Sequence, residues 1–496
     1  MTDGAGRGST RRTLVVVVGG GLGAAVAVAA AVAFFVGFGT TVSANALVNE
    51  PQPIDANNSP TVVRNPRRPD NLVVVHRVDA PSFSAILEAS VDGGRTWASR
   101  PLPLPAGADR PFAPDAAFAP DGTLLVLYAN LEGLGNTPAN LWLSRSSDGG
   151  HTLSIPTRVA GKLSFQPRLA VDQRGTVYVT WLQATTVGLF SLGTTPSPVV
   201  VARSDDGGQT FSPPATVSDP RRLRVGAASP VIDSAGRLHV LYEDFKGDRR
   251  DFENLDGPPA EEPFALVVTR SDDGARTFSP GVEVEPEVVP TGRFVAFLPA
   301  FPSLAAGPAS TLYVTWSDGR NGDEDVFLRR SADSGATWSS PVRVNDSRQG
   351  DGTSQYLPRV AVAASGRVDV VFLDRRRDPT NVKADAFLAS SDDRGRSFAN
   401  TRLSSQPFDS QIGNGTPHGD PDFGSRLGLA SHGPQTLAVW TDTRLGSRDT
   451  GRQDIAAATV RHLPVWPIVV WPVVAGLVAS VALAGTLRRS ARRKNS

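Results

Sequence analysis

The 496-residue chain contains no cysteine, one methionine, six histidines and five tyrosines. Without cysteine, it can form no disulfide bond, thiolate metal site or cysteine nucleophile. The histidines show no H-x-x-x-H spacing, so no zinc site is predicted. The 50 basic and 49 acidic residues give a formal net charge of +1, so no overall positive field indicates a nucleic-acid partner.

The chain is instead rich in turn formers, with 48 glycines and 40 prolines, which is typical of many short strands. The pattern S-x-D-x-G-x-T-[W/F] occurs six times, 56 to 67 residues apart when counted between its aspartates. Asp and Gly favour a tight turn whose Ser and Thr hydroxyls bond within it. A fixed period predicts one supersecondary unit per repeat. We call these segments the repeated turns: Ser90–Trp97, Ser146–Leu153, Ser204–Phe211, Ser271–Phe278, Ser331–Trp338 and Ser391–Phe398.

The repeated turns resemble the Asp box, or bacterial neuraminidase (BNR) repeat, of β-propellers in the sialidase/neuraminidase superfamily. Three copies depart from the pattern: Leu153 replaces the aromatic residue, Ala275 the second glycine and Ser397 the threonine. The resemblance covers residues 46–463 and implies an all-β propeller. In that family the motif is structural and lies away from the catalytic face, so it predicts the fold more strongly than an activity.

Each repeat is predicted to form one blade of four strands, because alternating Val, Ala and Tyr segments are separated by turn residues. A seventh unit has three predicted strands at 425–430, 436–440 and 454–460 and no repeated turn. Since an open sheet edge is unfavourable, we expect Ala46–Asn49 to supply its fourth strand. The sequence thus predicts seven blades, with six, as in sialidase catalytic domains, as the alternative. The six units with a repeated turn span about 58–104, 110–160, 164–218, 226–286, 297–346 and 355–404.

Two apolar runs, 14–38 and 465–487, are each long enough to cross a bilayer. The flanking arginines predict that residues 1–13 and the basic tail 488–496 are cytoplasmic, with the propeller at 46–463 extracytoplasmic at the cell membrane. The first run is either a retained transmembrane helix or a signal segment cleaved at Ala44-Asn45-Ala46. Strand order then predicts that the repeated turns face the membrane.

One position of each predicted first strand should point into the central channel. In six units this position is found seven residues before a recurrent glycine, and in the first unit it is aligned by the strand alone. The position holds Thr61, Asp115, Arg168, Ser229, Ala300, Arg359 and Arg426. Several arginine forks together bind carboxylates well, so this ring predicts an anionic ligand. The alternative interpretation is that the arginines pair with carboxylates of neighbouring blades.

The family resemblance also implies roles for particular residues. Arg168, Arg359 and Arg426 would clamp a sialate carboxylate, and Asp115 would handle the proton. Tyr356 would be the nucleophile and Glu243 the glutamate that activates it, and these two residues are the pair to test. Packing in the core is nevertheless the favoured interpretation of Tyr356. The R-I-P signature of sialidases is absent.

Two further sets of polar residues have a structural and a functional interpretation. The D-x-R pairs that follow the second strands are interpreted as ion pairs that hold the loops. The alternative interpretation is a ring of hydrogen-bond acceptors for sugars. No cofactor is predicted, and calcium is an alternative for Asp323–Asp325 and His418–Asp422, which lack EF-hand spacing. The D-x-R pairs are Asp318/Arg320, Asp374/Arg376 and Asp442/Arg444.

These patterns lead to two functional hypotheses. The first is a membrane-anchored, sialidase-like propeller that binds, and in its fullest form hydrolyses, an anionic glycan at the outward face. The second is a non-catalytic propeller that acts as a surface binding or scaffold protein, because a fold does not determine a function.

Overall fold

The computed structural model describes residues 39–134, 136–185, 197–246, 263–289, 302–413 and 423–463. Val42–Arg461 forms one compact unit, and the described residues beyond it, at 39–41 and 462–463, belong to a second. Both predicted transmembrane runs lie outside the described residues. Within the ranges given above, no helix has the length and hydropathy of a membrane span.

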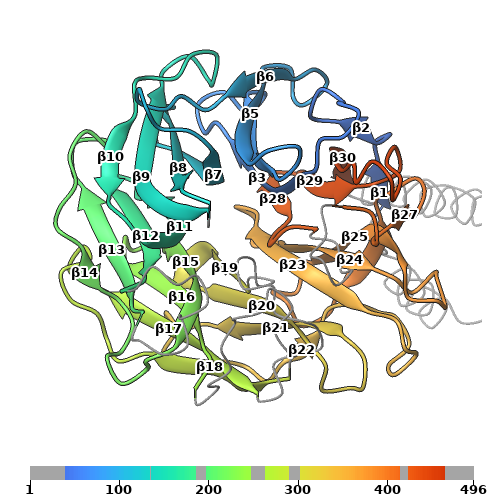
Figure 1. The fold of residues 1–496 in the computed structure, drawn as a ribbon. Coiled ribbons are helices and arrows are strands. Elements are labelled where there is room, and N and C mark those ends of the chain that lie inside the picture. The colour runs from blue at the N-terminus through green and yellow to red at the C-terminus, as the bar shows by residue number, and fades with distance from the viewer. Residues whose placement is uncertain are drawn as a thin grey trace, which may run out of the picture. The chain divides into compact units, whose positions relative to one another are not determined.

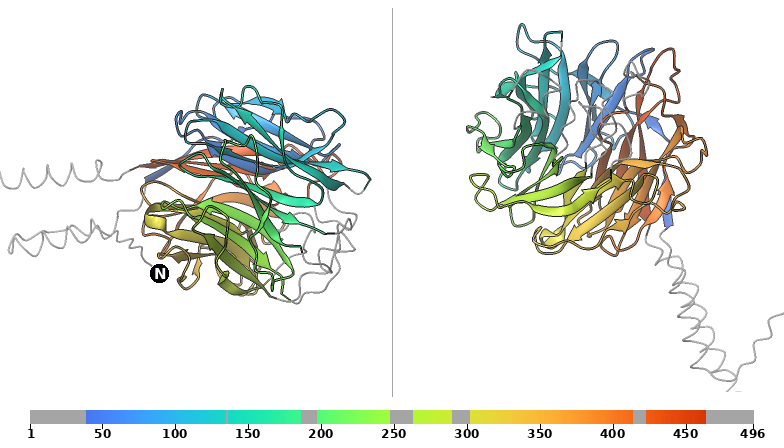
Figure 2. Two further views of the ribbon diagram at one scale, coloured as in Figure 1. Left: turned by 90° about the vertical axis from the view of Figure 1, so that its left-hand side faces the viewer. Right: turned by 60° about the horizontal axis from the view of Figure 1, so that its bottom comes forward.

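The compact unit is a ring of antiparallel sheets around a central axis (Figures 1 and 2). The described strands form seven sheets, so the prediction of seven blades is confirmed and the alternative of six is wrong. The one regular helical segment in the described part of the chain is the 3-10 turn η2 (Pro308–Ser310) in blade five.

The strands follow one another from the axis outward in each of the first six blades. Blade one contains β3 (Asn57–Arg64), β4 (Leu72–Val78), β5 (Ser84–Ser90) and β6 (Ala98–Pro101). Blade two contains β7 (Pro111–Phe118), β8 (Leu124–Glu132), β9 (Thr137–Ser146) and β10 (Thr157–Ala160). Blade three contains β11 (Ser164–Val171), β12 (Val177–Gln183), β13 (Val199–Ser204) and β14 (Ala215–Thr216).

The remaining blades keep this order, with additions at the last two. Blade four contains β15 (Val225–Ile232), β16 (Leu238–Asp244), β17 (Phe264–Ser271) and β18 (Val282–Val288). Blade five contains β19 (Ser303–Ala306), β20 (Leu312–Asp318), β21 (Asp325–Ser331) and β22 (Val342–Arg343). Blade six contains β23 (Gln355–Val362), β24 (Val368–Asp374), β25 (Lys383–Ser391) and β26 (Ala399–Arg402), and β27 (Phe408–Asp409) also pairs with β25. Blade seven contains β28 (Gly428–His432), β29 (Gln435–Asp442), β30 (Asp454–Leu463) and β1 (Gly39–Val42), and β2 (Ala46–Leu47) also pairs with β30.

Blade seven is closed by the N-terminal segment, as predicted. In β2, Ala46 and Leu47 pair with Ala457 and Ala456 of β30. The Asn49 side chain then donates to the Asp454 carboxylate at 3.1 Å and accepts the Ile455 N–H at 2.6 Å. The outer edge of β30 is therefore covered by residues from the other end of the chain, which removes an exposed edge.

The repeated turns share one pattern of hydrogen bonds. In all six, the first Ser donates to one carboxylate oxygen of the Asp at 2.7–2.8 Å. The Thr hydroxyl, or that of Ser397, donates to the other oxygen at 2.5–2.7 Å. These bonds favour the charged carboxylate: the Thr337 hydroxyl and amide hold the pKa of Asp333 at about 2. Ala275 keeps the turn although its φ is 68°.

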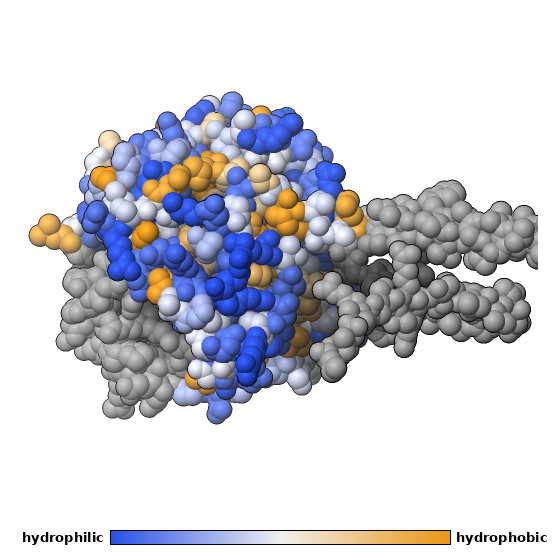
Figure 3. Space-filling model, turned by 90° about the vertical axis from the view of Figure 1, so that its right-hand side faces the viewer, coloured by the Kyte–Doolittle hydropathy of each residue, from blue (hydrophilic) through white to orange (hydrophobic). Residues whose placement is uncertain are grey.

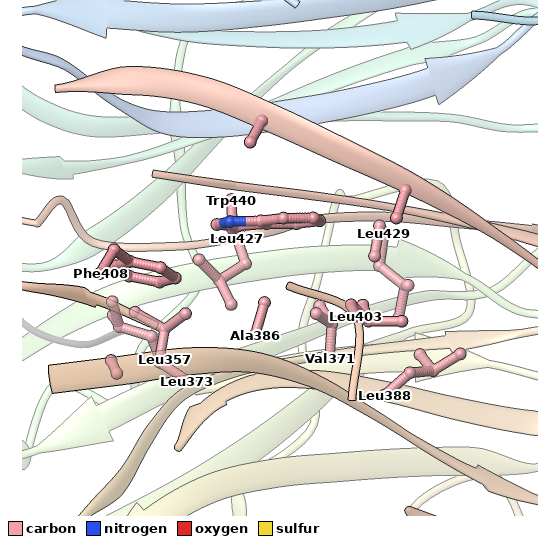
Figure 4. Close-up of a cluster of buried hydrophobic side chains, with 14 of the residues drawn as sticks. Leu357, Val371, Leu373, Ala386, Leu388, Leu403, Phe408, Leu427, Leu429 and Trp440 are labelled. Atoms are coloured by element: carbon pink, nitrogen blue, oxygen red, sulfur yellow. The ribbon is translucent and has the colours of Figure 1, made fainter. Parts of the chain in front are cut away.

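The hydrophobic core lies between the blades. Alternate residues of β24 are divided: Val371 and Leu373 pack toward blade seven, and Val370 and Phe372 toward blade five. Trp440 is central to the first of these clusters (Figure 4). Because both faces of the second strands are buried, they read as near-continuous apolar runs. Hydrophilic residues cover most of the side of the molecule in Figure 3, with apolar residues scattered among them.

Candidate functional site

The first strands of five blades are irregular close to the channel position. Their pairing shifts over the three residues before Thr61, Asp115, Arg168, Ser229 and Arg359. Two residues before four of these positions, a non-glycine residue has positive φ: Ser59, Ala113, Gln166 and Leu357. A β-bulge bends the strand and redirects the side chains that follow it. The backbone therefore repeats a device that sets the direction of the ring side chains.

Strand pairing corrects the predicted ring in blade five. Arg359 pairs with Val371, the fourth residue of the second strand of its blade. The same register in blade five pairs Ser303 with Thr315. Ser303 therefore holds the ring position, and the predicted Ala300 lies outside the described residues.

Blade seven also departs from the glycine spacing. Here Gly428 pairs with Val439 in the equivalent register, and Arg426 lies two residues earlier. The glycine spacing gives the wrong ring position in blade seven because the turn between β28 and β29 is shorter than in the other blades. Here His432 pairs with Gln435 across a tight turn.

Arg426 nevertheless reaches the ring from the segment before β28. Its side chain is 5% exposed, and Nε donates to Thr61 Oγ1 at 2.8 Å. Nη2 donates to the carbonyl oxygen of Pro114 in blade two. Arg426 thus connects blade seven with blades one and two at the axis.

Asp115 joins three blades. One carboxylate oxygen accepts the Thr61 hydroxyl at 3.2 Å, and the other accepts the Leu169 N–H of blade three at 2.9 Å. Ser303 plays the same part in blade five, where its hydroxyl accepts the Val360 N–H of blade six at 3.2 Å. Asp115 therefore has a structural role, whatever its part in chemistry.

The three predicted ring arginines share one electrostatic environment around Asp115. Burial lowers the pKa of Arg168 to about 10, Asp115 opposes this change, and Arg359 adds to it. Burial also lowers the pKa of Arg359 and of Arg426, and the Arg168 charge lowers that of Arg426 further. The structure thus brings Arg168, Arg359 and Arg426 close enough to interact electrostatically.

Two of these three arginines, Arg359 and Arg426, form no ion pair with a described carboxylate. Arg359 is partly exposed and forms no hydrogen bond or ion pair with any described residue. Arg426 likewise has no carboxylate partner within the described ranges. Asp115, the acid that opposes the lowered pKa values of these arginines, is already bound to Thr61 and Leu169. The positive charges of Arg359 and Arg426 therefore favour an anion at the axis.

Tyr356 and Glu243 are not brought together. The Tyr356 hydroxyl accepts a hydrogen bond from Arg375 Nη2 at 3.3 Å, and the ring packs against the core between blades six and seven. Burial raises the pKa of Tyr356, and Arg375 opposes this change. No described carboxylate forms a hydrogen bond with the Tyr356 hydroxyl, although the charge of Glu324 also raises its pKa, and packing explains the aromatic residue at this position.

Glu243 is buried elsewhere. Its neighbour two positions earlier, Leu241, packs in the core between blades four and five, and strand alternation gives Glu243 the same side. Glu243 is 2% exposed, and its Oε2 has no hydrogen-bond partner. Burial raises its pKa to about 8, so it is predominantly protonated at neutral pH. The predicted Tyr–Glu pair is therefore absent, although each residue remains available for another role.

The D-x-R residues form the loop-holding ion pairs that the sequence favoured. Arg376 and Arg444 approach Asp374 and Asp442 at 2.6 and 2.8 Å, and Arg320 pairs with Asp318.

Of the two candidate calcium sites, the structure describes Asp323–Asp325. Both oxygens of Asp325 accept protein donors, from Asn321, Arg343 and Asn345. Across the described residues, no group of three or more acidic or histidine side chains is arranged to hold a metal ion. His418–Asp422 lies outside the described residues.

A cavity of about 460 Å³ lies beyond the ring, toward the repeated turns. It is lined by the ends of β3, β7 and β11, including Val62, Phe118 and Val171, and by Arg64 and Arg67.

The fold and this centre define a seven-bladed β-propeller with a cationic axis. No protein-family model matches the chain, and no curated protein matches its sequence. Solved structures do match. A protein of unknown function from Dyadobacter fermentans DSM 18053 is 13% identical, covering 86% of this chain and 100% of that one, with a TM-score of 0.47.

Two carbohydrate-active propellers are similarly distant. The Hadza microbial sialidase Hz136 is 16% identical, covering 79% of this chain and 74% of its own, with a TM-score of 0.43. A PL25 ulvan lyase, from a polysaccharide lyase family, is 10% identical, covering 81% and 93%, with a TM-score of 0.48. Each similarity concerns the overall fold and says nothing of the activity of this chain.

Proposed function

We propose that this chain is a membrane-anchored propeller of the sialidase-superfamily type that binds an anionic glycan at its axis. The observation that carries the proposal is Arg359, a partly exposed guanidinium without a partner among the described residues, beside Arg168 and Arg426. The anion would be a carboxylate of an acidic sugar. The repeated turns and their resemblance to Asp boxes support the choice of a glycan.

The physical argument concerns the balance of charge. An arginine fork donates two parallel hydrogen bonds to a carboxylate, and each charge-assisted bond contributes about 1.5–3 kcal/mol. The three arginines have lowered pKa values because burial disfavours their charge, and repulsion by other arginines lowers those of Arg168 and Arg426 further. A bound anion would relieve both costs, whereas a neutral sugar would relieve neither.

Binding has more support than hydrolysis. An exo-α-sialidase would need an activated nucleophile, and Tyr356 lies against Arg375 instead of a carboxylate. The scaffold alternative is favoured by one observation, since Asp115 and Arg426 link neighbouring blades. The membrane part of the proposal rests on the two apolar runs, with the repeated turns facing the bilayer.

The test uses the full chain purified in detergent and titrated calorimetrically with N-acetylneuraminic acid, galacturonic acid and galactose. We expect an acidic sugar to bind and galactose not to bind. Arg359→Ala should weaken acidic-sugar binding at least tenfold, and Arg444→Ala, which alters a paired arginine, should not. Equal binding of galactose, or full affinity in Arg359→Ala, would contradict the proposal.

A parallel assay with a fluorogenic α-sialoside tests the enzymatic form of the proposal. Turnover that is lost in both Arg168→Ala and Arg359→Ala would establish an exo-sialidase. Binding without turnover would identify a glycan-binding propeller.

A further inference from the structure

Arginines on the side of the ring opposite the repeated turns are mostly paired with carboxylates. Arg343 contacts Asp325 at 3.2 Å, and Arg402 contacts Asp385 at 2.6 Å. The three D-x-R arginines are paired in the same way. An arginine without a carboxylate is therefore an exception on this side.

Arg375, which follows the end of β24, is such an exception. Its Nη2 donates to Ser410 Oγ at 2.8 Å and to Tyr356 Oη at 3.3 Å, and its guanidinium lies 4.7 Å from the centre of the Tyr356 ring. It forms no ion pair with any carboxylate of the described residues, and its Nε is buried without a hydrogen-bond partner. The adjacent Arg376, in contrast, is bound by Asp374 and Asp346.

The surroundings hold Arg375 in place without neutralising it. The aromatic ring and two hydroxyl groups fix the guanidinium, and the side chain remains partly exposed. The charge of Glu324 reaches Tyr356 and raises its pKa, but Glu324 forms no ion pair with Arg375. A fixed, accessible and unneutralised guanidinium is a suitable anion-binding group.

Arg375 lies along the blade from Arg359. Arg359 pairs with Val371, and Arg375 lies four residues farther along that strand and its end. At a rise of about 3.3 Å per residue, the backbones are about 13 Å apart along the strand direction. The Arg375 guanidinium is held by Tyr356 and Ser410, whereas Arg359 shares the electrostatic environment of Arg168 and Asp115, so the two guanidinium groups have different surroundings.

From this geometry we propose that Arg375 forms a second anion subsite, so that the ligand is an acidic oligosaccharide with at least two anionic groups. This inference rests on the proposed function, because the first anion is the one at Arg359. The proposed ligand is therefore a sugar chain that extends from the axis toward the loop containing Ser410, and not a single terminal acidic sugar.

The experiment compares monomers and trimers of acidic sugars on the full chain in detergent. The ligands are N-acetylneuraminic acid and its α2,8-linked trimer, galacturonic acid and its α1,4-linked trimer, and maltotriose as a neutral trimer. Calorimetry gives the affinity of wild type, Arg375→Ala, Arg375→Lys, Arg359→Ala and the paired-arginine control Arg444→Ala. Thermal unfolding of each variant checks that it is folded.

We expect one acidic trimer to bind wild type at least tenfold more tightly than its monomer, beyond the roughly threefold gain from having three equivalent residues. Arg375→Ala should remove this gain and leave monomer binding unchanged, and Arg375→Lys should keep part of it. Arg359→Ala should weaken monomer and trimer alike.

The outcomes separate the two proposals. If trimer and monomer bind alike, or if Arg375→Ala keeps the full gain, the second subsite is refuted while binding at Arg359 stands. If no acidic ligand binds, or maltotriose binds as well as the acidic trimers, the proposed function fails and the second subsite fails with it.

Discussion

The repeated turns and the ring of channel residues differ in how their charges are satisfied. In each turn, both oxygens of the aspartate at the third position are bound by hydroxyl groups of the same turn. The ring position holds residues of different chemistry in different blades, and Arg359 has no partner within the described part of the chain. A repeat that satisfies itself needs no ligand. The candidate site lies where the repeat is broken and charge remains unbalanced.

The largest expected effect concerns Asp115. In Asp115→Ala the buried Leu169 N–H loses its acceptor, and the three arginines lose the carboxylate that opposes their lowered pKa values. We expect a loss of about 3–5 kcal/mol in the free energy of unfolding, as for a broken buried ion cluster. Urea unfolding measures it. The control is Ser303→Ala, which removes a neutral acceptor from Val360 and should cost about 1 kcal/mol. Equal losses would show that the arginines do not depend on Asp115.

A second prediction concerns Glu243, a buried acid outside the repeat. Its folded pKa of about 8 lies above the ordinary 4.5, so the folded state holds a proton that the unfolded state releases. Stability should therefore fall as pH rises from 4.5 to 8. Glu243→Gln removes this dependence and should stabilise the protein by about 1–3 kcal/mol at pH 8, with little gain near pH 4.5. Thermal unfolding at both pH values tests it, and a gain that is independent of pH would contradict the assignment.

The smallest effect belongs to a single repeated turn. The pKa of Asp333 is about 2 in the folded state against an ordinary 3.8, because the Thr337 hydroxyl and amide bind its charged form. Its stabilisation is present above about pH 4 and is lost as pH falls toward 2. Asp333→Asn should therefore be slightly less stable than wild type at pH 6 and equal to it at pH 2. Affinity for acidic sugars should not change, and a loss of affinity would show that turns and ring are coupled.

The fold could be predicted from the sequence because its signals are local and repeated. The six turns can be recognised in the sequence from their repeated Ser, Asp, Gly and Thr residues. The last unit lacks a fourth strand, and this absence indicated Ala46–Asn49 as the partner of its third strand. The turns follow from hydrogen bonds within each copy, and the closure follows from the cost of an exposed strand edge. The apolar runs at the two ends remain predictions.

The centre was predicted less well, since it depends on register. The bulges with Ala113, Gln166 and Leu357 at positive φ are not marked by glycine, and the signal that they share is the proline that follows each of them. Ser303 was missed because blade five was aligned by a glycine and not by pairing with Thr315. Nothing in the sequence distinguishes Arg375 from Arg376, the arginine of the D-x-R motif beside it. Only the contacts of Arg375 in the structure separate the two.

The measurement that tests the central claim most directly is a crystal structure of the full chain soaked with an acidic sugar that binds in solution. The account predicts density for its carboxylate within hydrogen-bonding distance of Arg359, shared with Arg168 or Arg426. The same soak of Arg359→Ala should show no such density. An acidic sugar bound elsewhere, with the three arginines unchanged and unoccupied, would contradict the claim that the unbalanced charge of the ring is the binding site.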